Sequence, residues 1–314
     1  MAIDSKYADH SNGIFVAPPT QSRLEAFRTF LYNSEAGSCL GRTPASWAKI
    51  MTFYVIFYSC LAGFFAVCMW GLLQTIDREV PKYQLDRSLI GTSPGLSSRP
   101  LPPEGRESVM TYKRADNEWT SSSEWLSTFG EFLKEYESPV AAGQECNYTS
   151  GKDNESEICA IDVNSWGDCK PNDTIATSPC VYFKLNKVYD WVPEYYKDLG
   201  SLPDHMPKQL KDLISQTLSG NPKEMAKVWL SCTGRYEADE TNLGEILYYP
   251  EQGFPGYFYP FRRQKGFLSP VVAVNFRNAK PDTEISVECR TWSPSMVQDR
   301  KEQLGVLNFK IKIE

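Results

Sequence analysis

The sequence has few of the residues and motifs on which most enzymes depend. It contains two histidines, no Asp-x-Asp pair of the kind that holds a nucleotide-sugar metal, no glycine-rich phosphate loop and no metal-ligand spacing. A Ser-His-Asp arrangement using His205 and the adjacent Asp204 is formally possible, but a histidine in a surface loop is the usual case. We therefore expect no catalytic, metal or cofactor site, and a lumenal transferase is the enzymatic alternative.

The sequence also has no strong excess of one charge. The formal net charge is −6, and the 49 residues before the hydrophobic run are nearly neutral, with five basic and four acidic side chains. Proteins that bind nucleic acid need a strongly basic face. We expect no nucleic-acid partner.

Long hydrophobic runs are absent except for one. Ile50 to Leu73 are 24 residues without a charged side chain. As a helix they rise about 36 Å, which exceeds the roughly 30 Å hydrocarbon core of a bilayer. The run is too long and too far from the N-terminus for a cleaved signal peptide, so it predicts a single membrane span. The expected domains are a tail at 1–49, a transmembrane helix at 50–76, a proline- and glycine-rich stem at 77–106, and a disulfide-bonded, glycosylated, β-rich domain at 107–314.

Cysteines and glycosylation sequons indicate which side the C-terminal domain faces, because lysines and arginines are similar on both flanks of the run. Three acceptor sequons begin at Asn147, Asn154 and Asn172. Six cysteines follow the run, an even number suited to an oxidising compartment: Cys146, Cys159, Cys169, Cys180, Cys232 and Cys289. We expect a type II protein of the plasma membrane with an exterior domain that carries N-linked glycans.

Six cysteines allow fifteen pairings, of which the sequential one is our choice. Cys232 and Cys289 occupy inward positions of two predicted strands and are expected to meet across a core. The remaining thiols, at Cys39, Cys60 and Cys68, lie in the tail or the span and are expected to stay reduced.

Hydrophobic periodicity predicts helices and strands around this cysteine framework. Helices are expected at 21–33, at 121–136 after a capping box formed by Ser121 and Glu124, and at 207–218. Strands are expected around 181–185, 228–232, 272–276, 285–289 and 307–313. The expected fold class is a single-pass transmembrane α-helix plus an immunoglobulin-like sandwich with added helices.

The span carries a feature that a bare membrane anchor does not need. Tyr58 lies nine residues past Lys49, about 13 Å deeper along a helix, where its hydroxyl requires an acceptor that lipid does not offer. A neighbouring helix is the better candidate for that acceptor. One face carries Tyr54, Phe57, Tyr58, Leu61 and Phe65, and a second, small-residue face carries Ser59, Ala62, Gly63 and Ala66.

An aromatic segment at 248–261 has two interpretations. Phe254, Tyr257, Phe258 and Tyr259 are either a protein-contact patch or the filling of the sandwich edge. The sequence favours neither.

The order of motifs along nearly the whole chain resembles the β subunits of the sodium/potassium pump and its proton/potassium relatives. The matching motifs are Asn33-Ser34-Glu35, Leu40-Gly41-Arg42-Thr43, Ser46-Trp47, Tyr54-Val55-Ile56-Phe57-Tyr58, Cys60-Leu61-Ala62-Gly63, Pro94-Gly95-Leu96, Lys184-Leu185-Asn186, Cys232-Thr233-Gly234, Gly253-Phe254-Pro255, Tyr259-Pro260, Asp282-Thr283-Glu284-Ile285, Glu288-Cys289 and Phe309-Lys310-Ile311-Lys312-Ile313. The first cysteine pair is closer together than in vertebrate members, and 195–226 is longer and helical in pattern.

The resemblance implies a non-catalytic subunit that pairs one-to-one with the catalytic α subunit, assists its folding, membrane insertion and surface delivery, and modulates potassium affinity. It implies that Tyr54, Phe57 and Tyr58 pack on the seventh helix of the α subunit, that the small face turns toward the tenth, and that the exterior domain caps the loop between the seventh and eighth helices. In that exterior domain we expect Phe254, Tyr257 and Tyr259 to contact the α subunit. The resemblance also implies the disulfides Cys146–Cys159, Cys169–Cys180 and Cys232–Cys289. Membrane lipid and a small single-span regulatory subunit are the further partners. The alternatives are a proton/potassium pump subunit and a type II adhesion glycoprotein.

Overall fold

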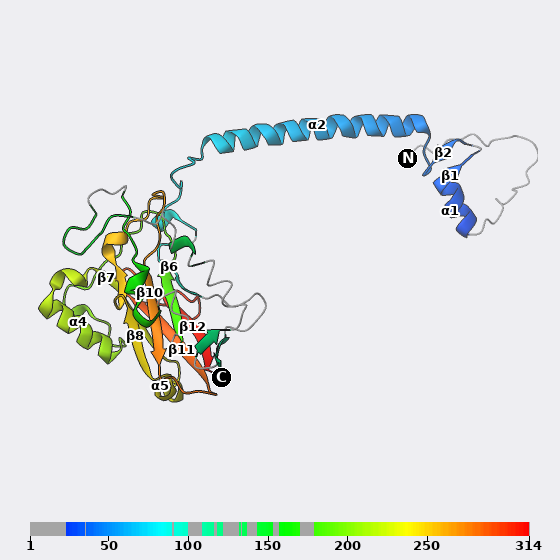
Figure 1. Cartoon of the computed structure of the whole chain (residues 1–314). Coiled ribbons are helices and arrows are strands. Elements are labelled where there is room, and N and C mark those ends of the chain that lie inside the picture. The colour runs from blue at the N-terminus through cyan, green and yellow to red at the C-terminus, as the bar shows by residue number, and fades with distance from the viewer. Residues whose placement is uncertain are drawn as a thin grey trace, which may run out of the picture. The chain divides into compact units, whose positions relative to one another are not determined.

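The computed structural model describes residues 23–34, 36–89, 91–99, 109–115, 118–121, 132, 134–136, 143–152, 157–169 and 179–313. The chain divides into two compact units, Met1–Asp77 and Arg78–Glu314 (Figure 1). Each is described by itself.

The first unit is built around one long helix. Helix α1 (Arg23–Leu31), which agrees with the expected helix at 21–33, leads into the short strands β1 (Tyr32–Asn33) and β2 (Ser38–Cys39), which pair with each other. Helix α2 (Pro44–Gln74) begins with proline in its first turn, where the missing amide hydrogen costs nothing. It ends at Thr75, whose hydroxyl donates to the Leu72 carbonyl oxygen at 2.8 Å.

Helix α2 contains the uncharged run and extends it by six residues toward the N-terminus. It is long and apolar enough to cross a membrane, and none of its residues is buried against the described part of the chain. These properties fit a single-pass membrane anchor.

The second unit is a sandwich of two sheets (Figure 1). One sheet has the strand order β3 (Leu96–Arg99), β6 (Cys180–Leu185), β10 (Val271–Arg277), β8 (Glu245–Tyr249), all antiparallel. The other has the order β5 (Glu118–Ser121), β4 (Val109–Ala115), β12 (Val306–Ile313), β11 (Glu284–Trp292), β7 (Lys227–Gly234), β9 (Gly253–Pro255). Strands β12 and β4 run parallel, and the other pairs of this sheet are antiparallel.

Alternate residues of the strands fill the space between the two sheets, as expected for period-two patterns. The centroid of the Phe309 ring on β12 lies 5.9 Å from that of Phe183 on β6 and 6.2 Å from that of Phe276 on β10. All three side chains are buried. The five strands expected from the sequence are therefore present as β6, β7, β10, β11 and β12.

Each sheet is also covered on its outer face. Helix α4 (Lys208–Gly220), expected at 207–218, packs Leu210 and Ile214 against Trp229 and Trp292 of the six-stranded sheet. The four-stranded sheet carries an aromatic cluster of Phe132, Tyr136, Trp166 and Tyr182. Because both faces of β10 are covered, Val271 to Phe276 are all buried. The other helices whose full bounds are described are short: η1 (Leu85–Arg87), η3 (Val163–Cys169), η4 (Leu199–Ser201), η5 (Pro222–Met225), α5 (Glu237–Leu243) and η6 (Gly256–Phe258).

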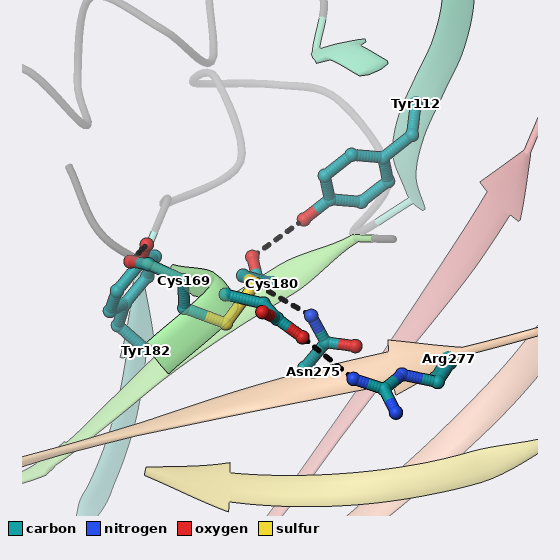
Figure 2. Close-up of a disulfide and its surroundings, with 7 residues drawn as sticks. Tyr112, Cys169, Cys180, Tyr182, Asn275 and Arg277 are labelled. Carbon is teal, nitrogen blue, oxygen red and sulfur yellow. Dashed lines mark hydrogen bonds and ion pairs between the residues drawn. A yellow bond between two sulfur atoms is a disulfide. The ribbon is translucent and has the colours of Figure 1, made fainter. Parts of the chain in front are cut away.

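The structure forms the three sequential disulfides, Cys146–Cys159, Cys169–Cys180 and Cys232–Cys289. Figure 2 shows the second, where Tyr112 from β4 of the other sheet donates its hydroxyl to the Cys180 carbonyl oxygen at 3.0 Å. Tyr182 donates to the Cys169 carbonyl oxygen, and the buried Asn275 amide donates to the Cys180 sulfur at 3.4 Å. This disulfide therefore lies where both sheets are held together.

The expectation that Cys232 and Cys289 meet across the core was wrong. They are register partners on the adjacent strands β7 and β11 of one sheet, with Cα atoms 4.0 Å apart. Both do point inward, but a periodic pattern gives the face of a strand and not its neighbour. An immunoglobulin disulfide instead joins the two sheets. The immunoglobulin-like assignment stays a prediction. The Cys232–Cys289 disulfide within one sheet and the parallel pairing of β4 with β12 both differ from the immunoglobulin pattern.

Two other local expectations differ from the structure. Part of the predicted stem at 77–106 belongs to the domain, because Leu96–Arg99 forms strand β3 and Leu85 packs against the main core. Ser121, expected to cap a helix, ends strand β5. Most of the predicted helix at 121–136 lies outside the described residues, and residues 134–136 are helical.

Candidate functional site

The exposed surface of α2 is the first candidate site. Phe53, Tyr54, Phe57 and Tyr58 stack along it, with ring centroids 6.1 Å apart for the two phenylalanines and 5.9 Å apart for the two tyrosines. The two pairs also meet edge to face, with centroids 5.4 Å apart for Phe57 and Tyr58. These contacts follow from helical geometry, since residues four apart are neighbours on a helix surface. The result is a broad, rigid aromatic surface with no partner in the described part of the chain.

The hydroxyl of Tyr58 makes this surface unsuited to lipid alone. The side chain is 59% exposed, and within the described residues no hydrogen bond to its oxygen is formed. A hydroxyl transferred to an apolar medium without a partner costs roughly 1 to 3 kcal/mol on protein scales. An acceptor on a neighbouring transmembrane helix would remove that cost.

The small-residue face lies beside the aromatic surface. Ser59, Ala62, Gly63 and Ala66 are all exposed, and a Cβ atom added to Gly63 would meet no heavy atom within 4 Å. Within the described residues, no neighbouring atom requires a glycine there. Small side chains let two helices approach closely, so this face is suited to a second helix.

The aromatic segment of the second unit is largely structural. Phe254 is fully buried in the main core, so the expectation that it contacts a partner was wrong. Aromatic composition alone does not show on which side of a sheet edge a ring lies. Tyr257 and Tyr259 are half-buried, and Tyr257 packs edge to face on Tyr148 with centroids 5.2 Å apart. Tyr259 likewise packs on Trp191 at 5.2 Å.

A buried ion pair anchors the first disulfide loop to this segment, and sequence reasoning missed it. Lys227, which is 5% exposed, pairs with Glu251, and Tyr148 donates its hydroxyl to the same carboxylate at 2.6 Å. The ammonium of Lys227 lies 5.0 Å from the ring centroids of Tyr148 and Trp229. Burial and the Glu251 carboxylate raise the pKa of Tyr148 above its ordinary value, so it stays a donor. The sequence signal that could have revealed this buried lysine is its place at the start of an apolar strand, β7.

A second charged cluster lies on the same face of the six-stranded sheet, beside a groove whose lining includes His205, Arg290 and Arg300. The buried Glu288 accepts hydrogen bonds from Arg290 and Arg300. Burial alone would raise the pKa of Glu288, but these arginines outweigh it and hold the pKa below its ordinary value. Nearby, His205 Nε2 lies 3.3 Å from Gln298 Oε1 and its ring packs on Trp292, so the Ser-His-Asp arrangement with Asp204 is not formed.

The structure describes one of the three sequons. Asn147 is exposed, and its side-chain oxygen accepts hydrogen bonds from the backbone N–H groups of Thr149 and Ser150, both at 2.8 Å. An exposed asparagine can carry a glycan without disturbing the core. Asn154 and Asn172 lie outside the described residues.

Comparison with known proteins decides the family. The model of the sodium/potassium ATPase beta chain matches residues 17–309, nearly the whole chain. This protein belongs to the sodium/potassium ATPase beta chain family. The match includes α2 and the strands of the sandwich as far as Phe309 in β12.

Relatives in this family are similar over almost their full length. The sodium/potassium-transporting ATPase subunit beta-2 of Drosophila melanogaster is 40% identical over 308 residues, which cover 95% of this chain and 94% of that protein. Subunit beta-1 of the same organism is 35% identical over 94% of this chain and 95% of its own length. The human subunit beta-2 is 27% identical over 92% of this chain and 94% of its own length.

Proposed function

We propose that this beta chain is the non-catalytic subunit of a sodium/potassium P-type ATPase. It pairs one-to-one with the catalytic α subunit, assists the folding, membrane insertion and surface delivery of that subunit, and modulates its potassium affinity. The names of the relatives favour the sodium/potassium pump over the proton/potassium pump. A type II adhesion glycoprotein would not need the aromatic surface within its span.

The observation that carries this proposal is the aromatic face of α2. Tyr54 and Tyr58 stack on each other within the uncharged run of α2, next to a face of small residues. A lone anchor gains nothing from a buried phenol, whereas a helix partner supplies both an acceptor and a packing surface. We assign Tyr54, Phe57 and Tyr58 to contact with one transmembrane helix of the α subunit, and Ser59, Ala62, Gly63 and Ala66 to contact with a second.

The proposal includes the orientation. The second unit, with three disulfides and the exposed sequon at Asn147, faces the cell exterior, and the tail before α2 faces the cytosol. The exterior domain is a variant of the immunoglobulin-like sandwich, and it contacts the α subunit through Tyr257 and Tyr259, which are half-buried at its surface.

Removing both phenol hydroxyls tests the helix contact. We expect a variant with Tyr54→Phe and Tyr58→Phe to assemble with the α subunit but to change the potassium concentration that half-activates the pump. A lost hydrogen bond in a membrane is worth about 0.6 to 2 kcal/mol. If one such bond acts on only one pump conformation, the half-activating potassium concentration is expected to shift roughly threefold to thirtyfold. The measurement is ATPase activity against potassium concentration in membranes that express both subunits.

Tyr236→Phe is the matched control, because it removes the same atom from a side chain 62% exposed in the second unit. Its half-activating potassium concentration should equal that of the parent. An unchanged potassium dependence of the double variant would remove the role assigned to this face.

A further inference from the structure

The segment that follows the membrane helix is held against the exterior domain. Arg263 donates through its guanidinium to the carbonyl oxygens of Arg78 and Glu79, the second of these at 3.3 Å. A few residues later Leu85 packs on the main core. Residues 78–89 are thus a strap on the domain instead of a free linker.

Chain geometry then places the loop 261–267 near the membrane. Four residue steps separate Gln74, the last residue of α2, from Arg78. A fully extended chain spans at most about 3.6 Å per residue, so these steps cover at most about 14 Å. The interfacial layer of a bilayer is several ångströms thick on each side, so a loop bound to Arg78 stays close to the headgroups when α2 spans the membrane.

This loop and the strap carry a concentration of positive charge on a chain whose net charge is −6. We call six exposed cations, five on these segments and Lys187, the basic strap surface: Arg78, Lys82, Lys187, Arg262, Arg263 and Lys265. The strap also carries the exposed Arg87. The acidic side chains of the strap are Glu79 and Asp86, and Asp190 pairs with Arg262 at 2.6 Å.

The hydrogen bonds of this surface leave much of its charge uncompensated. Lys187 donates to the Phe267 carbonyl oxygen at 3.0 Å, and Arg263 donates to the two strap carbonyls. Carbonyl oxygens orient these cations without neutralising them. Among the described residues, no ion pair with a carboxylate is formed by Arg263, Lys187 or Lys265.

Apolar side chains are exposed on the same strap. Val80, Tyr83 and Leu89 are 40%, 64% and 103% exposed. Tyrosine at the membrane–water interface and lysine or arginine beside it are the usual anchors of protein at the headgroup level. A soluble surface has no need to combine them.

We propose that the basic strap surface binds the phosphate groups of lipid headgroups in the leaflet from which the C-terminal end of α2 emerges. Arg263 positions the strap, Lys82, Lys187 and Lys265 contact phosphates, and Tyr83 inserts at the interface. The contact fixes the exterior domain close to the bilayer. This proposal requires that α2 spans the membrane, but it does not require an α subunit. The lipid contact and the proposed function can therefore be disproved independently.

Site-directed spin labelling in liposomes tests this contact. The experiment uses the full-length chain, in which serine replaces Cys39, Cys60 and Cys68. A nitroxide label is attached at Lys265→Cys. The labelled protein is reconstituted in phosphatidylcholine liposomes that contain a nickel-chelating lipid. We expect lipid-borne nickel to relax this label several-fold more strongly than a label at Lys280→Cys. Lys280 is also an exposed lysine. It lies just after the C-terminal end of β10, whereas the loop 261–267 lies just before the N-terminal end of that strand.

Charge reversal separates phosphate binding from mere tethering. Adding Lys82→Glu and Lys187→Glu should lower the relaxation at position 265 toward that at position 280, whereas the matched Lys301→Glu should not. Equal relaxation at 265 and 280, or no effect of reversal, would overturn the proposal. A third result would also overturn it. If co-purification with the α subunit shields the label at position 265 from both lipid-borne and aqueous nickel, the α subunit and not lipid covers this surface.

Discussion

A full-length variant carrying Cys232→Ala and Cys289→Ala is expected to unfold at a temperature about 8 to 16 °C below that of the parent. The bond closes a loop with a sequence separation of 57 residues. In the chain-entropy model it contributes about 4 kcal/mol, and each kcal/mol shifts the unfolding midpoint of a domain of this size by about 2 to 4 °C. Thermal unfolding of the detergent-solubilised protein, followed by tryptophan fluorescence, measures the shift.

Two other variants calibrate this result. Cys146→Ala with Cys159→Ala opens a loop with a sequence separation of only 13 residues, for which the same model gives about 3 kcal/mol. Cys39→Ala removes a thiol that is in no disulfide and should leave the midpoint unchanged. A midpoint for the Cys232 and Cys289 variant equal to that of the parent would show that the β7–β11 pairing holds without the bond.

The Glu251→Gln variant is expected to lose about 3 kcal/mol of stability, a fall of about 6 to 12 °C in the unfolding midpoint. Lys227 is 5% exposed, so loss of the carboxylate charge leaves an ammonium group in the domain interior with only a neutral amide oxygen and aromatic rings beside it. Breaking one side of a buried pair leaves an uncompensated charge, which is the costly case. The same fluorescence-detected unfolding measures it.

The double variant Lys227→Met with Glu251→Leu is the decisive comparison. Because it removes both charges, it should recover most of the stability that Glu251→Gln loses. Asp190→Asn is the control, since it removes a carboxylate from the exposed pair with Arg262 and should change the midpoint little. A Glu251→Gln midpoint like that of the control would mean that the cation–aromatic contacts suffice for Lys227.

Sequence periodicity predicted the elements better than their arrangement. Val272, Val274 and Phe276 alternate on one strand and point into the core as expected, and α4 lies within a few residues of its predicted bounds. Their neighbours were not predictable, because strand pairing is set by contacts between distant parts of the chain. The cross-strand position of Cys232 and Cys289 is the clearest case.

Composition misled where it was used in place of periodicity. The proline- and glycine-rich segment at 77–106 indicated a linker, but Leu96 and Ser98 point into the domain as part of β3. The composition of the aromatic segment suited a contact patch and a filled sandwich edge equally, and Phe254 fills the core. Lys227 had no sequence signal strong enough to predict a buried charge. In α2 the structure adds the stacking of Tyr54 on Tyr58 to a face that helical spacing had already identified.

If α2 and the exterior domain serve a catalytic partner, the full-length chain purified in mild detergent should behave differently with and without that partner. The chain is expressed alone and together with an α subunit, and its oligomeric state and surface delivery are measured in both cases. We expect a one-to-one complex that reaches the cell surface when the α subunit is present, and retention inside the cell when it is not. A solitary, folded chain that reaches the surface equally well without any α subunit would contradict the account.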